Sequence, residues 1–558
     1  MAAAVAGTVP AISAPTSLYK RGARAQNPPV SSGGRAARRW PRSCTIGSGE
    51  GPVVTTPQYE RLSSLDQTFL SFETATTHMH IALTAIFEVG PLGERGGVDI
   101  GRVRRHIAAR LHLIPRYRQR LACVPFVREP VWVDDEHFDL GYHVRHASLP
   151  HPGDEGQLRG RCEEILERPL DRTRPLWETW IIEGLGRRRF AMLTKVHHCL
   201  VDGVGGVGII TTLLSMDPES EPETPPPWTP RPAPSAAVMV GGEVLRRGRA
   251  LVDLGQQARR VGRDPAALGR ALRRRGEAVW SLLASGITAT PRTPLTCDVG
   301  PHRRVHWLAL DLPQVKAVKR ALGGTVNDVV LATVAGGLRR FLLERRGGAG
   351  LRDFKVAVPV NVRADGERGL GNRASIWILT LPLAEADPRR RLAAIHAATD
   401  ELKRRGGADG AAVLTEAAEW AGASVVHLAV RLIALASPYN LIVTNVPGPP
   451  MALYLLGARM EQAYPYLPLF QSQGLGVALF SYRDQIFCGL TGDWDGLPDV
   501  AELGDALEQA FGELHLAAAA GALGRRVAEA PREERVPDGV DHLGGRRRAG
   551  TAVHASHH

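Results

Sequence analysis

Two neighbouring histidines, His197 and His198, followed by Asp202 and Gly203, are the residues of this sequence best suited to chemistry. A neutral imidazole can accept a proton from an alcohol or an amine near pH 7, provided that its ring and tautomer are fixed. A carboxylate such as Asp202 could hold the loop through an internal ion pair, and a glycine permits a turn that a Cβ would obstruct. This stretch is therefore a candidate catalytic site. A pair of buried, hydrogen-bonded structural histidines is the alternative.

The flanking residues predict how the two histidines are positioned. Residues 190–196 form a short, largely apolar run of strand length, and residues 207–214 are typical of the start of a helix. The histidines then lie at the end of a strand. Because successive side chains of an extended backbone point to opposite sides, His197 and His198 cannot share one role. We expect one to face a channel and the other to face the protein interior.

A metal site and a cysteine nucleophile are two other possible chemistries for this stretch. The spacing of His197, His198 and Asp202 matches no regular ligand set, and no CxxC or HExxH motif accompanies it. Alternation would point the sulfur of Cys199 away from the ring of His198, and buried, unreactive cysteines are common. We expect no metal here and a core-packing role for Cys199.

Residues 197–203 read HHxxxDG, a motif shared by CoA-dependent acyltransferases, peptide-synthetase condensation domains and bacterial wax ester synthases/diacylglycerol acyltransferases. Four further motifs narrow the choice to the last group: LDQTFL at 65–70, PLW at 175–177, NDVVLA at 327–332 and TNVPGP at 444–449. They occur in that family's order. From about Leu62 to about Leu516 the sequence thus resembles the wax ester synthase/diacylglycerol acyltransferase (WS/DGAT) family of the CoA-dependent acyltransferase superfamily.

The resemblance implies an acyl-CoA-dependent O-acyltransferase that esterifies diacylglycerol, long-chain alcohols or both, with His198 as the general base. Acyl-CoA would be a co-substrate, and neither a bound cofactor nor a metal is expected. The implied catalytic residues are His197, His198, Asp202 and Gly203, and the implied substrate-binding residues are Pro175, Leu176, Trp177, Asn327 and Asp328. Core packing by Trp177 and helix capping by the Asn327-Asp328 pair are the alternatives for those residues.

Length and composition indicate a folded protein with more than one domain. The 558 residues exceed the size at which one core stops growing, while hydrophobic content is 44% and charged content 23%. No apolar segment is long enough to span a bilayer. Six cysteines without metal-type spacing favour a reduced compartment, and the N-terminus does not read as a secretory signal. We expect a cytoplasmic protein, which could lie on the inner face of the membrane or on lipid inclusions.

Composition shifts divide the chain into five parts. Residues 1–57 are predicted to be a disordered basic extension, 58–216 a first acyltransferase domain with HHxxxDG, and 217–290 a Pro-rich linker with basic amphipathic helices. Residues 291–520 form a second acyltransferase domain and 521–558 a mobile tail. The family implies an α/β (α+β) fold of two chloramphenicol-acetyltransferase-like halves. Each would be a mixed β-sheet with helices, and a channel would run between them.

The net charge of +12 is concentrated in residues 1–57 and 241–280. Both segments lie outside the predicted folded domains and lack interleaved aromatic residues, which argues against nucleic-acid binding. Asp264-Pro265 resembles an N-cap and first-turn proline that separates two helices. Such a basic amphipathic pair can lie on an anionic membrane surface, or it can be a connector packed against the domains. Both interpretations stay open.

Two other functions are compatible with parts of the pattern. One is a peptide-synthetase-like condensation enzyme that acylates an amine, although no carrier module is visible. The other is a non-catalytic lipid-surface-binding protein, against which the intact set of His197, His198, Asp202 and Gly203 argues. Thr296 and Arg373 stand where relatives often have Asn and Gln, which bears on substrate preference rather than on the fold.

Overall fold

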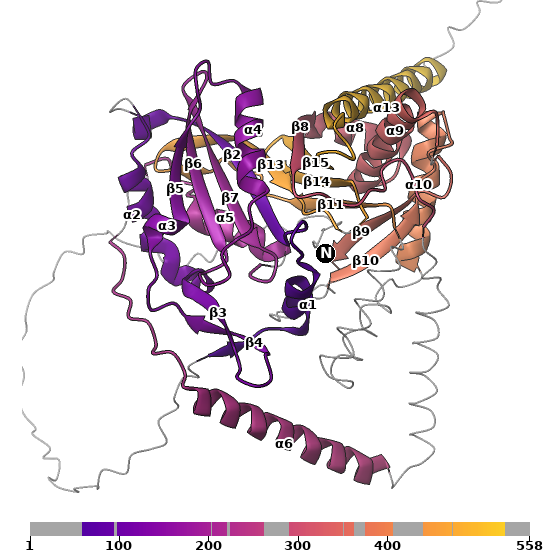
Figure 1. The fold of residues 1–558 in the computed structure, drawn as a ribbon. Coiled ribbons are helices and arrows are strands. Elements are labelled where there is room, and N and C mark those ends of the chain that lie inside the picture. The colour runs from indigo at the N-terminus through magenta and orange to yellow at the C-terminus, as the bar shows by residue number, and fades with distance from the viewer. Residues whose placement is uncertain are drawn as a thin grey trace, which may run out of the picture.

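The computed structural model describes residues 59–93, 97–201, 203–219, 224–261, 290–349, 351–361, 374–404, 439–470 and 472–529. These residues form two halves, each built on a six-stranded β-sheet with helices packed against it (Figure 1). The predicted mixed α/β architecture with two sheet-containing halves is confirmed. Residues 1–57, predicted to be a disordered extension, lie outside the described residues.

The sheet of the first half carries the histidine pair. Its strand order is β12-β13-β2-β7-β6-β5. Strands β2, β7 and β6 are antiparallel to one another and β5 is parallel to β6. The strands and helices are β2 (His80–Glu88), β5 (Val144–Ser148), β6 (Trp177–Leu185), β7 (Arg189–His197), α2 (Ile100–Arg110), α3 (Leu140–His143), α4 (Glu155–Leu166) and α5 (Gly203–Leu213), with 3-10 turns at Gly90–Gly93, Leu111–Leu113 and Pro115–Arg118.

The two strands at one edge of this sheet come from the C-terminal part of the chain. They are β12 (Tyr454–Leu455) and β13 (Ala458–Tyr466), and β13 pairs antiparallel with β2. The sequence analysis did not predict them, and a proline such as Pro465 is unusual in a strand with neighbours on both sides. The C-terminal part of the chain thus completes the first sheet and ties the two halves together.

The sheet of the second half has the order β10-β9-β11-β14-β15-β8. Its members are β8 (Arg303–Asp311), β9 (Lys355–Asn361), β10 (Ala374–Thr380), β11 (Leu441–Pro447), β14 (Leu475–Tyr482) and β15 (Gln485–Asp493). Helices α8 (Leu312–Leu322), α9 (Val326–Arg346), α10 (Pro388–Arg404) and α13 (Val500–Glu529) pack beside it (Figure 1). Buried aliphatic side chains of these helices and strands form one core.

A short helix and a small sheet lie against the first half beneath the histidines. Helix α1 (Ser64–Phe72) begins with a capping box between Ser63 and Asp66. The small sheet, β1-β4-β3, consists of β1 (Glu60–Arg61), β3 (Gln119–Cys123) and β4 (Pro130–Asp134). Phe69 of α1 packs with Trp132 of β4 in a buried cluster. The LDQTFL motif is therefore held against the histidine stretch.

Two helices differ from the predicted boundaries. The helical spacing of apolar residues predicts a helix from Glu243, but helix α6 (Ala236–Val261) begins seven residues earlier, and the predicted break at Asp264-Pro265 lies outside the described residues. Helix α13 continues to Glu529, past the predicted end near Gly521, because that stretch still contains good helix formers. Among the described helices, none alone is long and apolar enough to cross a membrane. The bent pair α8 and α9, inclined by 97°, meets the length and composition criteria only together.

Candidate active site

The two histidines lie where strand β7 ends and the chain turns toward α5. His197 is the last residue of the strand, and its backbone carbonyl accepts from the N–H of Leu200 at 2.9 Å. The backbone N–H of His198 donates to the carbonyl of Met79 at 2.8 Å, which fixes the turn against the segment just before β2. The two imidazoles point to opposite sides: His198 lines a cavity and His197 does not.

The cavity that His198 lines lies between the two halves. Its volume is about 120 Å³, roughly ten times the space that one water molecule needs. One wall comes from β2, β7 and α5, and the other from β11, β13 and β14. His198, Thr194, Thr444 and Tyr466 are the polar side chains of a lining that otherwise consists of Ile81, Ala82, Leu83, Ala85, Met192, Val196, Val201, Gly206, Val207, Ile209, Ile210, Leu213, Leu214, Val446, Pro465, Leu467, Ala478, Leu479 and Phe480.

The imidazole of His198 is buried yet chemically available. Only 3% of the residue is exposed, and its ring stacks on Phe69 with 3.9 Å between centroids. Among the described residues neither ring nitrogen has a partner with good hydrogen-bond geometry, although the backbone of Val201 is close enough to raise the pKa of the ring slightly against the effect of burial. Burial lowers the pKa of His198 well below its ordinary value, so the ring is neutral near pH 7. A buried polar atom without a partner is costly. A substrate hydroxyl in the cavity would therefore relieve that cost.

His197 is held by protein groups instead. The backbone N–H of Cys199 donates to its Nδ1 at 3.1 Å, so in the neutral ring the proton is on Nε2. That Nε2 lies 3.5 Å from Oε2 of Glu73, which also accepts from Nε of Arg172 at 3.0 Å. The hydrogen bond from Cys199 fixes the tautomer of His197, whereas the Glu73 carboxylate faces Nε2 at a distance longer than a normal hydrogen bond and acts on it through its charge.

Glu73 is a site residue that the sequence analysis missed. It follows the last residue of α1 and lies far from the histidine pair in sequence. Burial would raise the pKa of its carboxyl, but the hydrogen bonds and charges of His197 and Arg172 outweigh burial and lower the pKa to about 2. Glu73 is therefore an anion that connects α1, the PLDRTRPLW segment and the first histidine. No motif surrounds Glu73 in the sequence, so its role becomes visible only once the fold brings it to His197.

Cys199 packs in the core, as the sequence predicts. It is 3% exposed and belongs to a buried cluster with Phe69, Trp132 and Leu176. Burial raises the pKa of its thiol well above the ordinary value, so the reactive thiolate is disfavoured. A nucleophilic role for this cysteine is therefore not supported.

The PLW motif holds the backbone of the histidine stretch and does not contact the cavity. The carbonyl of Leu176 accepts from the backbone N–H of His197 at 3.0 Å. Trp177 is fully buried, stacked on Tyr117 at 4.3 Å and on His143 at 4.6 Å, and its Nε1–H donates to the carbonyl of Tyr117 at 2.8 Å. None of Pro175, Leu176 and Trp177 lines the cavity. A direct contact with substrate stays a prediction.

Asn327 and Asp328 lie in the first turn of α9, where Thr325 is the N-cap. Asp328 completes a capping box with Thr325, accepts from Oγ1 of Thr399 at 2.8 Å, and lies 3.0 Å from Nδ1 of His396. Both residues are buried and neither lines the cavity. The observed contacts are those of a helix cap, and their predicted substrate binding stays untested.

The remaining predicted site residues are Asp202 and Gly203. Asp202 lies outside the described residues, so its role in holding the loop stays a prediction. Gly203 is the first residue of α5. Within the described ranges, no three His, Cys, Asp or Glu side chains lie close enough together to hold a metal ion.

Sequence comparisons identify the same family in both halves. The wax ester synthase/diacylglycerol acyltransferase catalytic domain family matches residues 62–330, and the WS/DGAT C-terminal domain family matches residues 370–515. A putative diacylglycerol O-acyltransferase of Mycobacterium tuberculosis is 34% identical over 467 residues, which cover 82% of this chain and 90% of that protein. A second, probable diacylglycerol O-acyltransferase of the same species is 31% identical and covers 81% and 95%.

Solved structures agree with this assignment. The wax ester synthase/diacylglycerol acyltransferase from Marinobacter aquaeolei VT8 is similar with a TM-score of 0.59 and 30% identity, covering 82% of this chain and all of that chain. The first condensation domain of the calcium-dependent antibiotic synthetase is similar with a TM-score of 0.53 at 18% identity, covering 84% and 98%. The second likeness shows a shared fold.

Proposed function

Because this chain belongs to the wax ester synthase/diacylglycerol acyltransferase family, we propose that it transfers a long-chain acyl group from acyl-CoA to the hydroxyl of diacylglycerol, a fatty alcohol or both. The observation that carries the proposal is His198, a neutral imidazole at an apolar cavity between the halves, whose two nitrogens have no hydrogen-bond partner within the part of the chain that the structure describes. An acceptor hydroxyl in that cavity could therefore form a hydrogen bond with a ring nitrogen of His198 without displacing another group of the described residues.

His198 would act as the general base. Its unprotonated nitrogen accepts the hydroxyl proton while the oxygen attacks the carbonyl carbon of the thioester. The tetrahedral intermediate then loses the thiolate as the C–S bond breaks, and the imidazolium returns its proton to the sulfur. The products are an ester and free CoA, and His198 ends neutral again. The low pKa that burial gives His198 keeps the base unprotonated between turnovers.

The cavity would supply selectivity and protect the thioester from water. Each methylene placed against such a lining contributes about 0.8 kcal/mol of binding. Several methylenes therefore outweigh any intrinsic difference among primary hydroxyls. A lining in which aliphatic residues predominate also leaves little to hold a hydrolytic water near His198. A hydrophobic alcohol should be preferred over a small polar alcohol or an amine.

Thiol release from palmitoyl-CoA, with each acceptor in turn, tests this proposal. The purified chain should release CoA and form the ester with dipalmitoylglycerol or hexadecanol, and hardly at all with ethanol or an amino acid thioester. Amide formation on an amine acceptor, with no reaction on lipid alcohols, would instead identify a condensation-like enzyme. Binding of lipid without any CoA release would identify a non-catalytic protein.

We also propose that the protein attaches to anionic lipid surfaces through α6. Val238, Leu245 and Val252, spaced by seven residues, are 49%, 63% and 59% exposed, so one side of the helix is apolar and open. The other side packs on the first half through Met239 and the buried Glu243, which pairs with Arg61. Figure 1 shows α6 as a separate rod beside the body. An exposed aliphatic stripe on a basic helix suits a lipid interface.

Flotation with vesicles tests the lipid-surface proposal. We expect the protein to float with vesicles in which about one third of the lipid is phosphatidylglycerol at low salt. The floated fraction should fall at high salt, where screening is strong. Leu245→Glu should abolish flotation, whereas Leu343→Glu, at an exposed leucine of α9 in the second half, should not. Equal flotation of both variants would contradict a role for α6.

A further inference from the structure

The cavity follows one face of two paired strands away from His198. Alternate residues of β7 line it, and their register partners on β2 lie beside them: Val196 with Ile81, Thr194 with Leu83, and Met192 with Ala85. At about 3.3 Å per residue, the path from His198 to Met192 spans roughly 20 Å. That length suits the extended hydrocarbon chain of a long-chain acyl or alkyl group.

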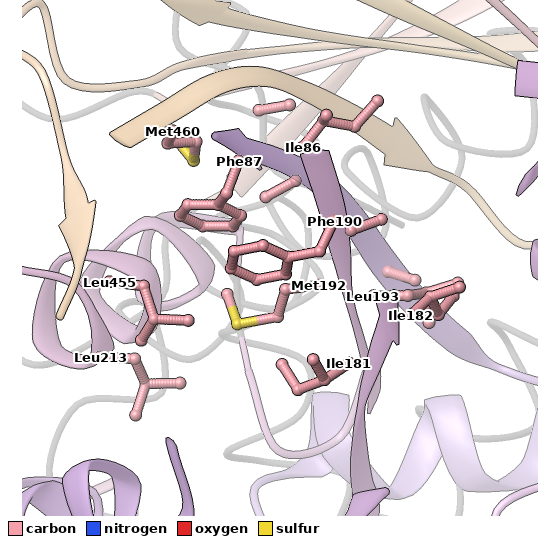
Figure 2. Close-up of a cluster of buried hydrophobic side chains, with 14 of the residues drawn as sticks. Ile86, Phe87, Ile181, Ile182, Phe190, Met192, Leu193, Leu213, Leu455 and Met460 are labelled. Carbon is pink, nitrogen blue, oxygen red and sulfur yellow. The ribbon is translucent and has the colours of Figure 1, made fainter. Parts of the chain in front are cut away.

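On this face of β7 and β2, the residues that line the cavity end at Met192 and Ala85. The next register pair is Phe190 and Phe87, whose rings stack with 5.2 Å between centroids and are inclined by 11°. Both are fully buried and neither lines the cavity. Figure 2 shows the two rings side by side, with Met460 beside Phe87 and Met192 beside Phe190. The stacked pair thus occupies the same face of the two strands directly beyond Met192 and Ala85, the last strand residues that line the cavity.

Side-chain size decides how far the open path extends. Ala85 is the smallest side chain among the β2 residues that pair with cavity-lining residues of β7, and it stands opposite Met192 just before the stacked phenylalanine pair. Leu213, the last residue of α5, and Leu214 after it also line the cavity. A larger residue at position 85 would fill the last part of the path, and a smaller one at 192 would lengthen it.

We propose that this cavity holds a single alkyl chain laid along β7, with its reacting end at His198, and that Ala85 and Met192 set the longest chain it accepts. The inference rests on the proposed acyl transfer. The shared chemistry is an unbranched hydrocarbon chain, which the acyl thioester or the alcohol acceptor could supply. Within the open path each added methylene should raise kcat/KM about fourfold, and beyond Met192 the gain should stop.

Two substrate series distinguish the two sources of the chain. One series varies acyl-CoA from eight to twenty carbons with hexadecanol as the fixed acceptor, and the other varies the alcohol with palmitoyl-CoA as the fixed donor. Ala85→Leu should shorten the optimum by about two to four carbons in one series only, because it adds about three carbon atoms at the end of the path. Met192→Ala should move the optimum of that same series to longer chains. The series that shifts identifies the occupant.

Met460→Ala is the matched control, because Met460 is equally buried in the same core but does not line the cavity. It should lower the melting temperature and leave both optima in place. If Ala85→Leu does not fold, the smaller change Ala85→Val should still shorten the optimal chain, and Met192→Ala should lengthen it. Unchanged optima in these variants, with normal turnover by the wild-type protein, would overturn the inference. No turnover by the wild-type protein would instead contradict the proposed function.

Discussion

The imidazole of His198 and the phenyl ring of Phe69 lie face to face, with centroids 3.9 Å apart and planes inclined by 16°. Phe69 belongs to α1, so the LDQTFL motif supplies the surface on which the proposed base rests. Since both ring nitrogens of His198 are unpartnered within the described residues, this stack and the burial around it fix the ring. Two motifs far apart in the chain thus meet in one ring stack.

Phe69→Leu tests the stack. The leucine keeps most of the apolar volume but offers no flat surface, so we expect kcat to fall roughly 10- to 100-fold, as for a misplaced catalytic group, with little change in KM. Steady-state kinetics with palmitoyl-CoA and hexadecanol measure this. Phe341→Leu in the core of the second half, also buried, should lower the melting temperature without this loss of kcat. Equal kcat in the Phe69 variant and the wild-type protein would contradict the positioning role.

The pH dependence of turnover follows from the pKa of His198. Burial places that pKa well below 6.5, so the free enzyme keeps an unprotonated base as the pH falls from 8 to 6.5. We expect kcat/KM to be level over that range and to decline only at clearly lower pH. Initial rates in buffers of constant ionic strength measure the profile. A half-maximal point at or above pH 6.5 would mean that another group limits the reaction.

Glu73 should stabilise the fold and the site through its charge. The pKa of its carboxyl is about 2 in the folded protein, against an ordinary value of 4.5, so its contribution is present above pH 4.5 and is lost as the pH falls toward 2. That shift corresponds to at most about 3 kcal/mol of unfolding free energy. Glu73→Gln should therefore lower stability at pH 7 and make it less sensitive to acid. Denaturant unfolding at pH 7 and pH 4 checks this.

The same variant should also affect turnover, because Glu73 holds the ring of His197. We expect a lower kcat with an unchanged KM for the acceptor. Glu164→Gln, which alters an exposed ion pair with Arg161, is the matched control and should change neither stability nor kcat appreciably. Identical acid sensitivity of Glu73→Gln and the wild-type protein would contradict the charge of Glu73 in the folded state.

Trp177 offers a test between core packing and substrate contact. Trp177→Phe keeps an aromatic ring between Tyr117 and His143 but removes the hydrogen bond to the carbonyl of Tyr117. If the role is structural, unfolding free energy should fall by about 1–3 kcal/mol, because that carbonyl loses its donor, and KM should not change. A raised KM at full stability would establish the predicted contact with substrate.

Local sequence patterns predict the elements whose signals are short-range. Thr325 is predicted to cap a periodic helix and does so through a capping box with Asp328. The strand expected over 303–310 is observed as Arg303–Asp311, and that expected over 190–196 as Arg189–His197. In these elements, periodicity, caps and apolar runs agree, which is the condition under which local patterns are reliable.

What the sequence could not provide depends on contacts between distant residues. Strand β13 contains Pro465 and finds its partner, β2, in the other half of the chain, so no local signal marks the pairing. Glu73 is a lone carboxylate until the fold brings it to His197. The alternation rule separates the two histidines correctly, but the stack of Phe69 on His198 depends on tertiary packing alone.

The central claim is that His198 is the base in acyl transfer, and His198→Ala tests it most directly. The initial rate of CoA release from palmitoyl-CoA with hexadecanol should fall by about 10²- to 10⁴-fold, the range typical of a lost general base. The melting temperature and the far-ultraviolet circular dichroism of the variant should stay close to those of the wild-type protein. A folded His198→Ala protein that releases CoA and forms the ester at nearly the wild-type rate would contradict the account.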